Sequence, residues 1–252
     1  MKKLICVFLI LSVLLAAGML AACGERPAEP SSSSSDAAPV DPAPSAPPSD
    51  PAAILDEWER TYTAGDFGIL NRDDPFVVLE IEGYGDIRIE LFPQVAPITV
   101  ENFLRYVEDG FYDGVVFHRV IASFMIQAGG FEERNGVAVQ KAATYPNIKG
   151  EFVNNGVANY LGHFPGVLSM ARGNDPDSGS SQFFICTARA SWLDGQYAAF
   201  GRVVDEESMA TALAIERVQT TTTYLYYGSV PVSSSDVPMT LPKIARAWVV
   251  QR

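Results

Sequence analysis

The sequence predicts a mainly β domain, in which many short strands form a closed or nearly closed sheet accompanied by two helices. Two observations lead to this prediction. Apolar runs of strand length recur between residues 76 and 250, and only two stretches within that range space their apolar residues as a helix does. Because closure removes exposed sheet edges, so many strands in one core favour a barrel-like arrangement.

The domain is expected to open with a β-hairpin followed by a helix. Residues 76–92, FVVLEIEGYGDIRIELF, contain two alternating runs joined near Gly83–Gly85. Pro97 suits a first helical turn, and Gly110 suits the end of the same helix. Between them, apolar residues repeat at three- and four-residue spacing: Val100, Phe103, Leu104 and Val107.

Further strands are predicted at six apolar runs, and a second helix is predicted at Glu206–Arg217. Residues 219–239 are expected to form a decorated surface loop, with a tyrosine-rich contact surface as the alternative. The six strand-like runs are Val115–His118, Phe124–Gln127, Val167–Ala171, Phe183–Thr187, Ala198–Val204 and Ala247–Val250.

The first residues are typical of a secretory signal. Lys2 and Lys3 precede an apolar run that extends to Leu20, and small residues then lead to Cys23. This pattern resembles a bacterial lipobox, so residues 1–22 are expected to be a lipoprotein signal peptide, with a retained transmembrane helix as the alternative. Cys23 is the expected lipidation site, which would carry an acyl group such as palmitate and hold the protein outside the cytoplasm on a bacterial membrane.

Two further segments precede the domain. Residues 23–53, the acylated cysteine and a Ser-, Pro- and Ala-rich run, are expected to be a disordered tether. Residues 54–73 are expected to include a short amphipathic helix. Loss of Lys2 and Lys3 with the signal leaves 18 − 2 = 16 basic against 30 acidic residues, a charge of −14. Such a surface repels nucleic acid and anionic headgroups, so membrane attachment would depend on the lipid.

The segment YDGVVFHRVIASFMIQAG, Tyr112–Gly129, carries the main indication of function. It places Arg119 among apolar side chains, where a guanidinium donates hydrogen bonds and keeps its proton. Polarisation without proton transfer is the chemistry that this suggests, and the alternative is a buried strand whose arginine extends to water. At the strand period of two, one face holds Phe117, Arg119 and Ile121, and another holds Met125 and Gln127.

The order Phe117-His118-Arg119, then Phe124-Met125-x-Gln127-Ala128-Gly129, resembles the cyclophilin family of peptidyl-prolyl isomerases. A second block from Gly166 onward, with GVLSMARG, SSQFFICTA and WLDGQYAAFGRV, resembles the same family. The resemblance covers about residues 74–252, and together with the lipobox pattern before Cys23 it points to a bacterial lipoprotein form of the enzyme. It implies an eight-stranded antiparallel β-barrel capped by two α-helices.

The resemblance implies a catalytic role for Arg119 and a proline pocket beside it. An arginine aimed at the proline nitrogen would bind the twisted X-Pro bond better than the planar one, which is what catalysis requires. Two departures are Tyr197, where many members carry histidine, and Arg172, where many carry asparagine. The implied substrate-binding residues are Phe124, Met125, Gln127, Ala171, Arg172, Gln182, Phe184, Trp192, Leu193 and Tyr197.

No cofactor and no metal are expected. His118 and His163 are 45 residues apart without ligand spacing, and residues 174–179 lack the pattern of an EF-hand and are interpreted as a turn. Cys186 is expected to be a small buried hydrophobe, and His118 a hydrogen-bonded structural neighbour of Arg119.

The expected partners are proline-containing polypeptide segments, with cyclosporin-type ligands added by the resemblance. Two other interpretations compete with an isomerase of secreted polypeptides. One is a non-catalytic module that holds proline-containing segments as a chaperone or scaffold. The other is a solute-binding lipoprotein, which would have a two-lobed α/β chain.

Overall fold

The computed structural model describes residues 73–250. The predicted signal peptide, Cys23, the tether and the helical extension up to residue 72 lie outside the described residues. Within residues 73–250, no helix is both long and apolar enough to cross a membrane.

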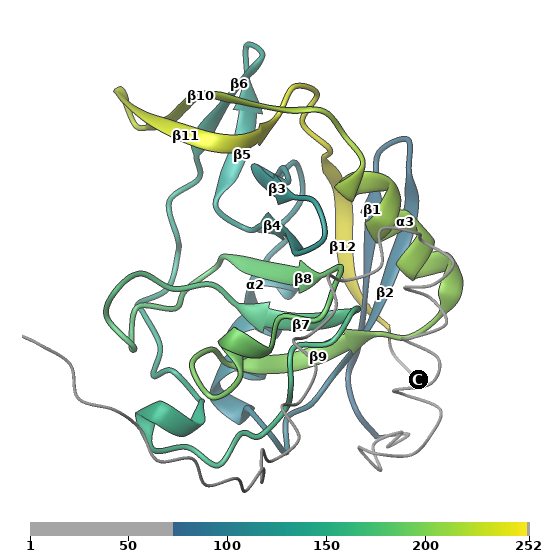
Figure 1. Cartoon of the computed structure of the whole chain (residues 1–252), viewed down its shortest axis with the longest axis vertical. Coiled ribbons are helices and arrows are strands. Elements are labelled where there is room, and N and C mark those ends of the chain that lie inside the picture. Colours follow the sequence, from purple (N-terminus) through teal and green to yellow (C-terminus); the bar gives the residue numbers. More distant parts are fainter. Residues whose placement is uncertain (1–72, 251–252) are drawn as a thin grey trace, which may run out of the picture. The chain divides into compact units, whose positions relative to one another are not determined.

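Eight antiparallel strands form a curled sheet in the order β12-β1-β2-β9-β7-β8-β4-β3 (Figure 1). The predicted hairpin at residues 76–92 is confirmed as β1 and β2, and five of the six predicted runs fall on strands, the last of them within the longer β12. The bounds are β1 Phe76–Ile81, β2 Gly85–Leu91, β3 Arg119–Ile121, β4 Met125–Ala128, β7 Val167–Met170, β8 Phe183–Cys186, β9 Ala199–Val203 and β12 Ile244–Val250.

The curled sheet is a half-barrel, so the predicted full closure is overstated. Its edge strands β3 and β12 share no ladder. The two edges are joined instead by hydrogen bonds from the residues just before β3: the Gly114 N–H donates to the Ile244 carbonyl and the Phe117 N–H to the Pro242 carbonyl, both at 2.8 Å. The prediction of a strand at Val115–His118 is also wrong, because these residues form only isolated bridges. This stretch also bonds to Phe131 and Glu132 on its other side, and it builds a regular ladder with neither partner.

Both predicted helices are present, as α2 (Pro97–Glu108) and α3 (Glu206–Glu216). Pro97 begins α2, whose first N–H groups have no side-chain cap of their own. The buried Glu151 carboxylate accepts from the N–H groups of Ile98 at 3.1 Å and Thr99 at 2.7 Å, so a distant residue satisfies this helix end. In α3, Asp205 is the N-cap and accepts from the Ser208 N–H at 2.8 Å.

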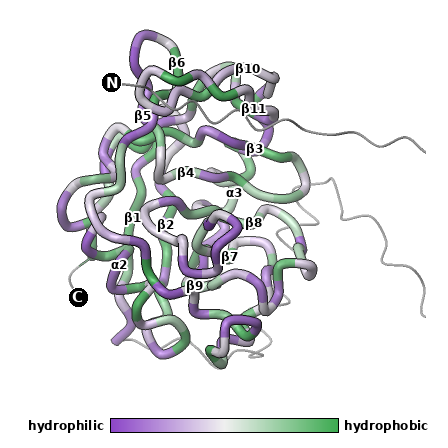
Figure 2. The backbone as a smooth tube through the Cα atoms, turned by 90° about the vertical axis from the view of Figure 1, so that its left-hand side faces the viewer, coloured by the Kyte–Doolittle hydropathy of each residue, from purple (hydrophilic) through white to green (hydrophobic). Residues whose placement is uncertain are grey.

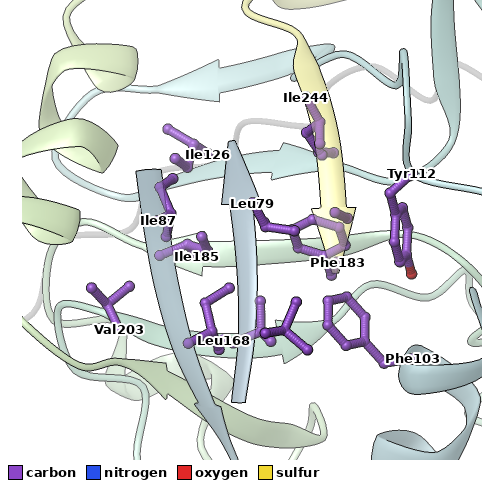
Figure 3. Packing of buried hydrophobic residues seen from close by; sticks show 14 of the residues in the cluster. Leu79, Ile87, Phe103, Tyr112, Ile126, Leu168, Phe183, Ile185, Val203 and Ile244 are labelled. Atoms are coloured by element: carbon purple, nitrogen blue, oxygen red, sulfur yellow. The ribbon is translucent and has the colours of Figure 1, made fainter. Parts of the chain in front are cut away.

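The core fills the concave side of the curled sheet and the space under α2 (Figure 3). Leu79 of the first hairpin lies beside Phe183 of β8, and Ile87 of the same hairpin lies beside Ile185 of the same strand. The rings of Phe103 and Phe183 pack edge to face at 5.3 Å. Complete burial of such side chains contributes about 2–3 kcal/mol each, which makes the sheet a firm base for the residues on its other face.

A second, four-stranded sheet corrects the prediction of a surface loop at residues 219–239. This stretch is a long hairpin, and the sheet order is β11-β10-β6-β5. Figure 2 shows this sheet at one end of the described chain, beyond β3 and β4. Leu225 faces inward to a small apolar cluster, while Tyr224 is exposed, and the alternative of a contact surface stays a prediction. The strands are β5 Phe131–Arg134, β6 Val137–Gln140, β10 Thr220–Tyr227 and β11 Val230–Pro238.

Candidate active site

A pocket of about 140 Å³ lies over β3, β4 and β8 and brings together all but two of the predicted site residues. The antiparallel register places residues that are far apart in sequence next to one another, with Gln127 of β4 opposite both Arg119 of β3 and Phe184 of β8. The pocket is lined by Arg119, Phe124, Met125, Gln127, Ala171, Arg172, Phe184, Leu193 and Tyr197.

Arg119 and Gln127 lie on the same face of the sheet, which corrects their predicted placement on two different faces. They are cross-strand partners, as are Ile121 and Met125, because a tight turn joins β3 to β4. The Arg119 Nη1 donates to the Gln127 Oε1 at 3.3 Å. The guanidinium is thus oriented by a neutral amide, and within residues 73–250 no carboxylate lies close enough to form an ion pair with it.

Gln182 does not line this pocket but fixes the amide that orients Arg119. The Gln127 Nε2 donates to the Gln182 Oε1 at 2.9 Å, so the Gln127 amide has a defined orientation. Two glycines make room for this contact. A Cβ at Gly130 would lie 2.5 Å from the Gln182 amide nitrogen, and one at Gly129, where φ is +95°, would lie 2.3 Å from the Ser181 carbonyl. Gln182 borders a second hollow, which it shares with Gln127, Ala171 and Arg172.

The wall of the pocket is apolar. Met125, Phe184 and Leu193 are buried in one cluster, against which Phe124, Ala171 and Tyr197 pack. Trp192 does not line the pocket: it is 57% exposed, and its ring centre lies 5.3 Å from that of Phe124, so it stands at the rim. Such a wall suits an apolar ring, and it surrounds a cationic donor that is only partly exposed.

A polar network behind the wall was not anticipated from the sequence. The buried His163 ring stacks on Phe184 at 6.0 Å, with its Nδ1 3.1 Å from the Asp194 carboxylate and its Nε2 3.0 Å from the Ser169 hydroxyl. Arg189 completes the network, because its Nη2 lies 2.6 Å from Asp194. Burial lowers the pKa of His163 against the opposing effect of Asp194, so this ring is a neutral support for Phe184 near pH 7.

A second unanticipated support holds the turn that carries Phe124. Ser123 has a φ of +54°, a backbone conformation that is strained for a residue with a Cβ. Its N–H donates to the Glu216 Oε1 at 2.7 Å, and the Thr187 hydroxyl donates to the same oxygen at 2.5 Å. The Thr187 N–H in turn donates to the Phe124 carbonyl at 2.9 Å. Glu216 of α3 thus links both chain segments to the edge of the pocket.

The two departures from the family pattern lie against each other. The Arg172 guanidinium carbon is 4.5 Å from the centre of the Tyr197 ring, a cation–π arrangement. Its Nε and Nη2 donate to the Gln196 carbonyl at 3.2 and 3.0 Å. The pair therefore forms a fixed, positively charged border to the pocket.

His118 and Cys186 are buried and take no evident part in proton transfer. Burial lowers the pKa of His118 to about 3, and no hydrogen-bond partner for its Nδ1 lies within residues 73–250. The expectation that the His118 ring is hydrogen-bonded beside Arg119 stays a prediction. Burial also raises the pKa of the Cys186 thiol well above its usual range, so its interpretation as a small buried hydrophobe is confirmed. In the part of the chain that the structure describes, no three His, Cys, Asp or Glu side chains are grouped to hold a metal ion.

Comparison with known proteins agrees with this fold. The model of the family described as cyclophilin type peptidyl-prolyl cis-trans isomerase/CLD matches residues 76–245. The chain therefore belongs to the cyclophilin family and is a peptidyl-prolyl cis-trans isomerase. A two-lobed solute-binding lipoprotein does not have this mainly β fold, so that alternative is wrong.

Two bacterial relatives carry the name peptidyl-prolyl cis-trans isomerase. The one from Dickeya dadantii is 44% identical over 148 residues, which cover 57% of this chain and 72% of that protein. The one from Acinetobacter baylyi is 44% identical over 152 residues, which cover 58% and 74%.

Two solved structures of a Cryptosporidium parvum cyclophilin type isomerase share the fold at 24% identity. The first has a TM-score of 0.55 and covers 71% of this chain and 99% of that one. The second, solved in the presence of the dipeptide Ala-Pro, has a TM-score of 0.54 and covers 70% and 99%.

Proposed function

We propose that Arg119 is the catalytic residue and that the pocket beside it binds the proline of secreted or surface polypeptides, whose folding the protein assists outside the cytoplasm. The observation that carries this proposal is the placement of Arg119. Its guanidinium borders an apolar pocket, is oriented by Gln127, and has no carboxylate ion-pair partner within the described residues.

Catalysis follows from the difference between the planar and the twisted X-Pro bond. Amide resonance opposes rotation by about 18–20 kcal/mol, and the proline nitrogen regains a lone pair at the twisted stage. A guanidinium that donates to this nitrogen stabilises the twisted state more than either planar state. A hydrogen bond to a charged group is worth about 1.5–3 kcal/mol, which corresponds to about 10- to 150-fold in rate.

The other residues would hold the peptide. Phe124, Met125, Phe184 and Leu193 offer the proline ring an apolar surface, and the Ala171–Arg172 segment borders the path of the peptide backbone. The ligand class agrees with the Ala-Pro dipeptide present with the solved cyclophilin type relative. Gln127, Gln182, Trp192 and Tyr197 would shape the border of the site. Cyclosporin-type ligands are proposed for the same pocket, and competition with a proline peptide tests this.

The Arg119→Ala variant tests the mechanism, with Arg119→Lys as its matched control. We expect the alanine variant to lose at least about tenfold in kcat/KM on a short X-Pro peptide while its circular dichroism stays that of the folded protein. Lysine keeps the charge but loses the planar fork that Gln127 orients, so an intermediate rate is expected. A folded alanine variant with full activity would remove Arg119 from the mechanism. A protein that binds the peptide without accelerating its isomerisation would instead indicate the non-catalytic module.

We also propose that the mature protein is attached to a bacterial membrane by a lipid on Cys23. The support is the basic start, the apolar run and the small residues that precede this cysteine. The Cys23→Ser variant is expected to lose acyl labelling and membrane association while its peptide isomerisation is unchanged. A serine variant that stays in the membrane fraction would indicate a retained transmembrane helix.

A further inference from the structure

We propose that the site selects substrates carrying an acidic residue within three positions of the proline, and that Arg172 is the residue that makes this selection. The inference rests on the proposed function and adds a substrate class to it. Three observations support it: the site is lined by arginines and no carboxylate, hydrogen bonds and aromatic rings fix the Arg172 guanidinium, and salt screens the distant acidic residues.

The charge of the site is opposite to that of the chain. The sequence has 30 acidic and 18 basic residues, yet the pocket and the adjoining hollow are lined by two arginines and no carboxylate. A peptide that places its proline in the pocket passes neighbouring residues along the hollow, because Gln127, Ala171 and Arg172 line both. A carboxylate of the peptide there would meet an electropositive surface.

Arg172 is held in place before any substrate binds. Besides its two hydrogen bonds to the Gln196 carbonyl, its Nη1 donates to the Gly173 carbonyl at 2.9 Å. The guanidinium also lies over Tyr197 and, at 5.3 Å, over Phe152. A carboxylate that binds an already ordered guanidinium avoids most of the entropy cost of ordering a long side chain.

The acidic residues nearest in sequence to Arg172 have other partners. The Asp175 Oδ1 accepts from the Asp177 N–H at 2.9 Å, and the Asp177 Oδ1 accepts from the Gly150 N–H at 2.9 Å and from Asn155 at 2.7 Å. Among the described residues, no carboxylate oxygen lies within 4.0 Å of the Arg172 nitrogens. The positive charge at the border is therefore not neutralised by an ion pair within residues 73–250.

Distant acidic residues oppose a negative substrate only weakly. At about 0.15 M salt, exposed charges are screened over about 8 Å, whereas a carboxylate in contact with Arg172 would be partly shielded from solvent. Exposed ion pairs of this kind change binding by about twofold to fivefold. We therefore expect kcat/KM to rise by that factor when a neutral residue at the favoured position becomes acidic.

The test compares peptide pairs that differ only in Glu against Gln, which have the same shape. The pair is moved through the three positions before and the three after the proline, and a protease-free exchange assay is run on the full chain in non-ionic detergent. We expect a Glu-to-Gln ratio of about two to five at one position or more. The ratio should fall to about one in Arg172→Gln and stay above one in Arg172→Lys. Arg246→Gln, which removes an exposed arginine on β12, should keep the wild-type ratio.

Three outcomes would overturn the inference. One is a ratio of one at every position, and another is a ratio that persists in Arg172→Gln. If that variant does not fold, the wild-type ratio is measured in 0.5 M salt, where a charge effect must decrease and an unchanged ratio refutes it. Equal acceleration of both peptides refutes only this inference, whereas acceleration of neither also refutes the proposed function.

Discussion

Glu216 is expected to control the shape of the proline pocket from outside it. It lies near the end of α3, where its Oε1 accepts hydrogen bonds from the strained Ser123 and from Thr187. The perturbation is Glu216→Ala, which leaves the motif residues Arg119 and Phe124 in place. Without the carboxylate, the Ser123 N–H loses its acceptor, and the β3–β4 turn, in which Ser123 has a φ of +54°, keeps within the described residues only the hydrogen bonds of Phe124 to Ile121 at 3.2 Å and of Thr187 to Phe124 at 2.9 Å.

The expected effect on stability is about 2–3 kcal/mol. Two hydrogen bonds to a charged acceptor contribute about 1.5–3 kcal/mol each, and the lower values apply because this site is partly exposed. The strain at Ser123 adds about 1 kcal/mol in favour of relaxing the turn. Relaxation moves Phe124 at the pocket wall but not the Arg119–Gln127 pair, so KM should rise about threefold to tenfold and kcat should change little.

Urea unfolding and steady-state kinetics on one X-Pro peptide measure these two effects. Glu207→Ala is the matched control, because Glu207 lies on the same helix and its contact with Arg88, at 3.0 Å, is exposed. Ser123→Gly in the Glu216→Ala background should restore part of the loss, since glycine adopts a positive φ without strain. If Glu216→Ala has the same free energy of unfolding and the same KM as Glu207→Ala, Glu216 has no role in positioning the β3–β4 turn.

Three further predictions concern pH, the second sheet and metal ions. His118 binds a proton below about pH 6.5 in the unfolded chain but only near pH 3 in the folded chain. The free energy of unfolding, measured in urea, should therefore decrease as the pH is lowered from 6.5 to 3, by up to about 1.4 kcal/mol per pH unit, and should decrease less steeply in His118→Gln. Leu225→Ala should cost about 2 kcal/mol in urea unfolding and Val232→Ala, its 45% exposed cross-strand partner, under about 0.5. EDTA should leave kcat/KM unchanged, and a reproducible loss would contradict a mechanism that uses Arg119 alone.

The parts of the fold predicted well from the sequence are those with strong local signals. The first hairpin alternates apolar residues around Gly83–Gly85, and α2 repeats them at helical spacing between Pro97 and Gly110. The second sheet lacks such signals. Its hairpin at residues 220–238 is rich in Thr, Ser and Tyr, and β10 meets β6 through Tyr226 and Val139, which are distant in sequence. Contacts of this kind depend on the whole fold and leave no local pattern.

The site shows the same division between what a motif predicts and what the fold supplies. Arg119, Phe124 and Gln127 follow one another from β3 through the turn into β4, so their order in the sequence indicates the pocket directly. The groups that hold the pocket in shape reach it by hydrogen bonds across 93 residues, from Glu216 to Ser123, and 31 residues, from Asp194 to His163. No spacing rule connects such residues, because a carboxylate on one element can serve a backbone N–H on any other. A related chain could therefore keep every motif residue and still lose its pocket. A prediction of activity from sequence should also check that the position of Glu216 holds a hydrogen-bond acceptor for the β3–β4 turn.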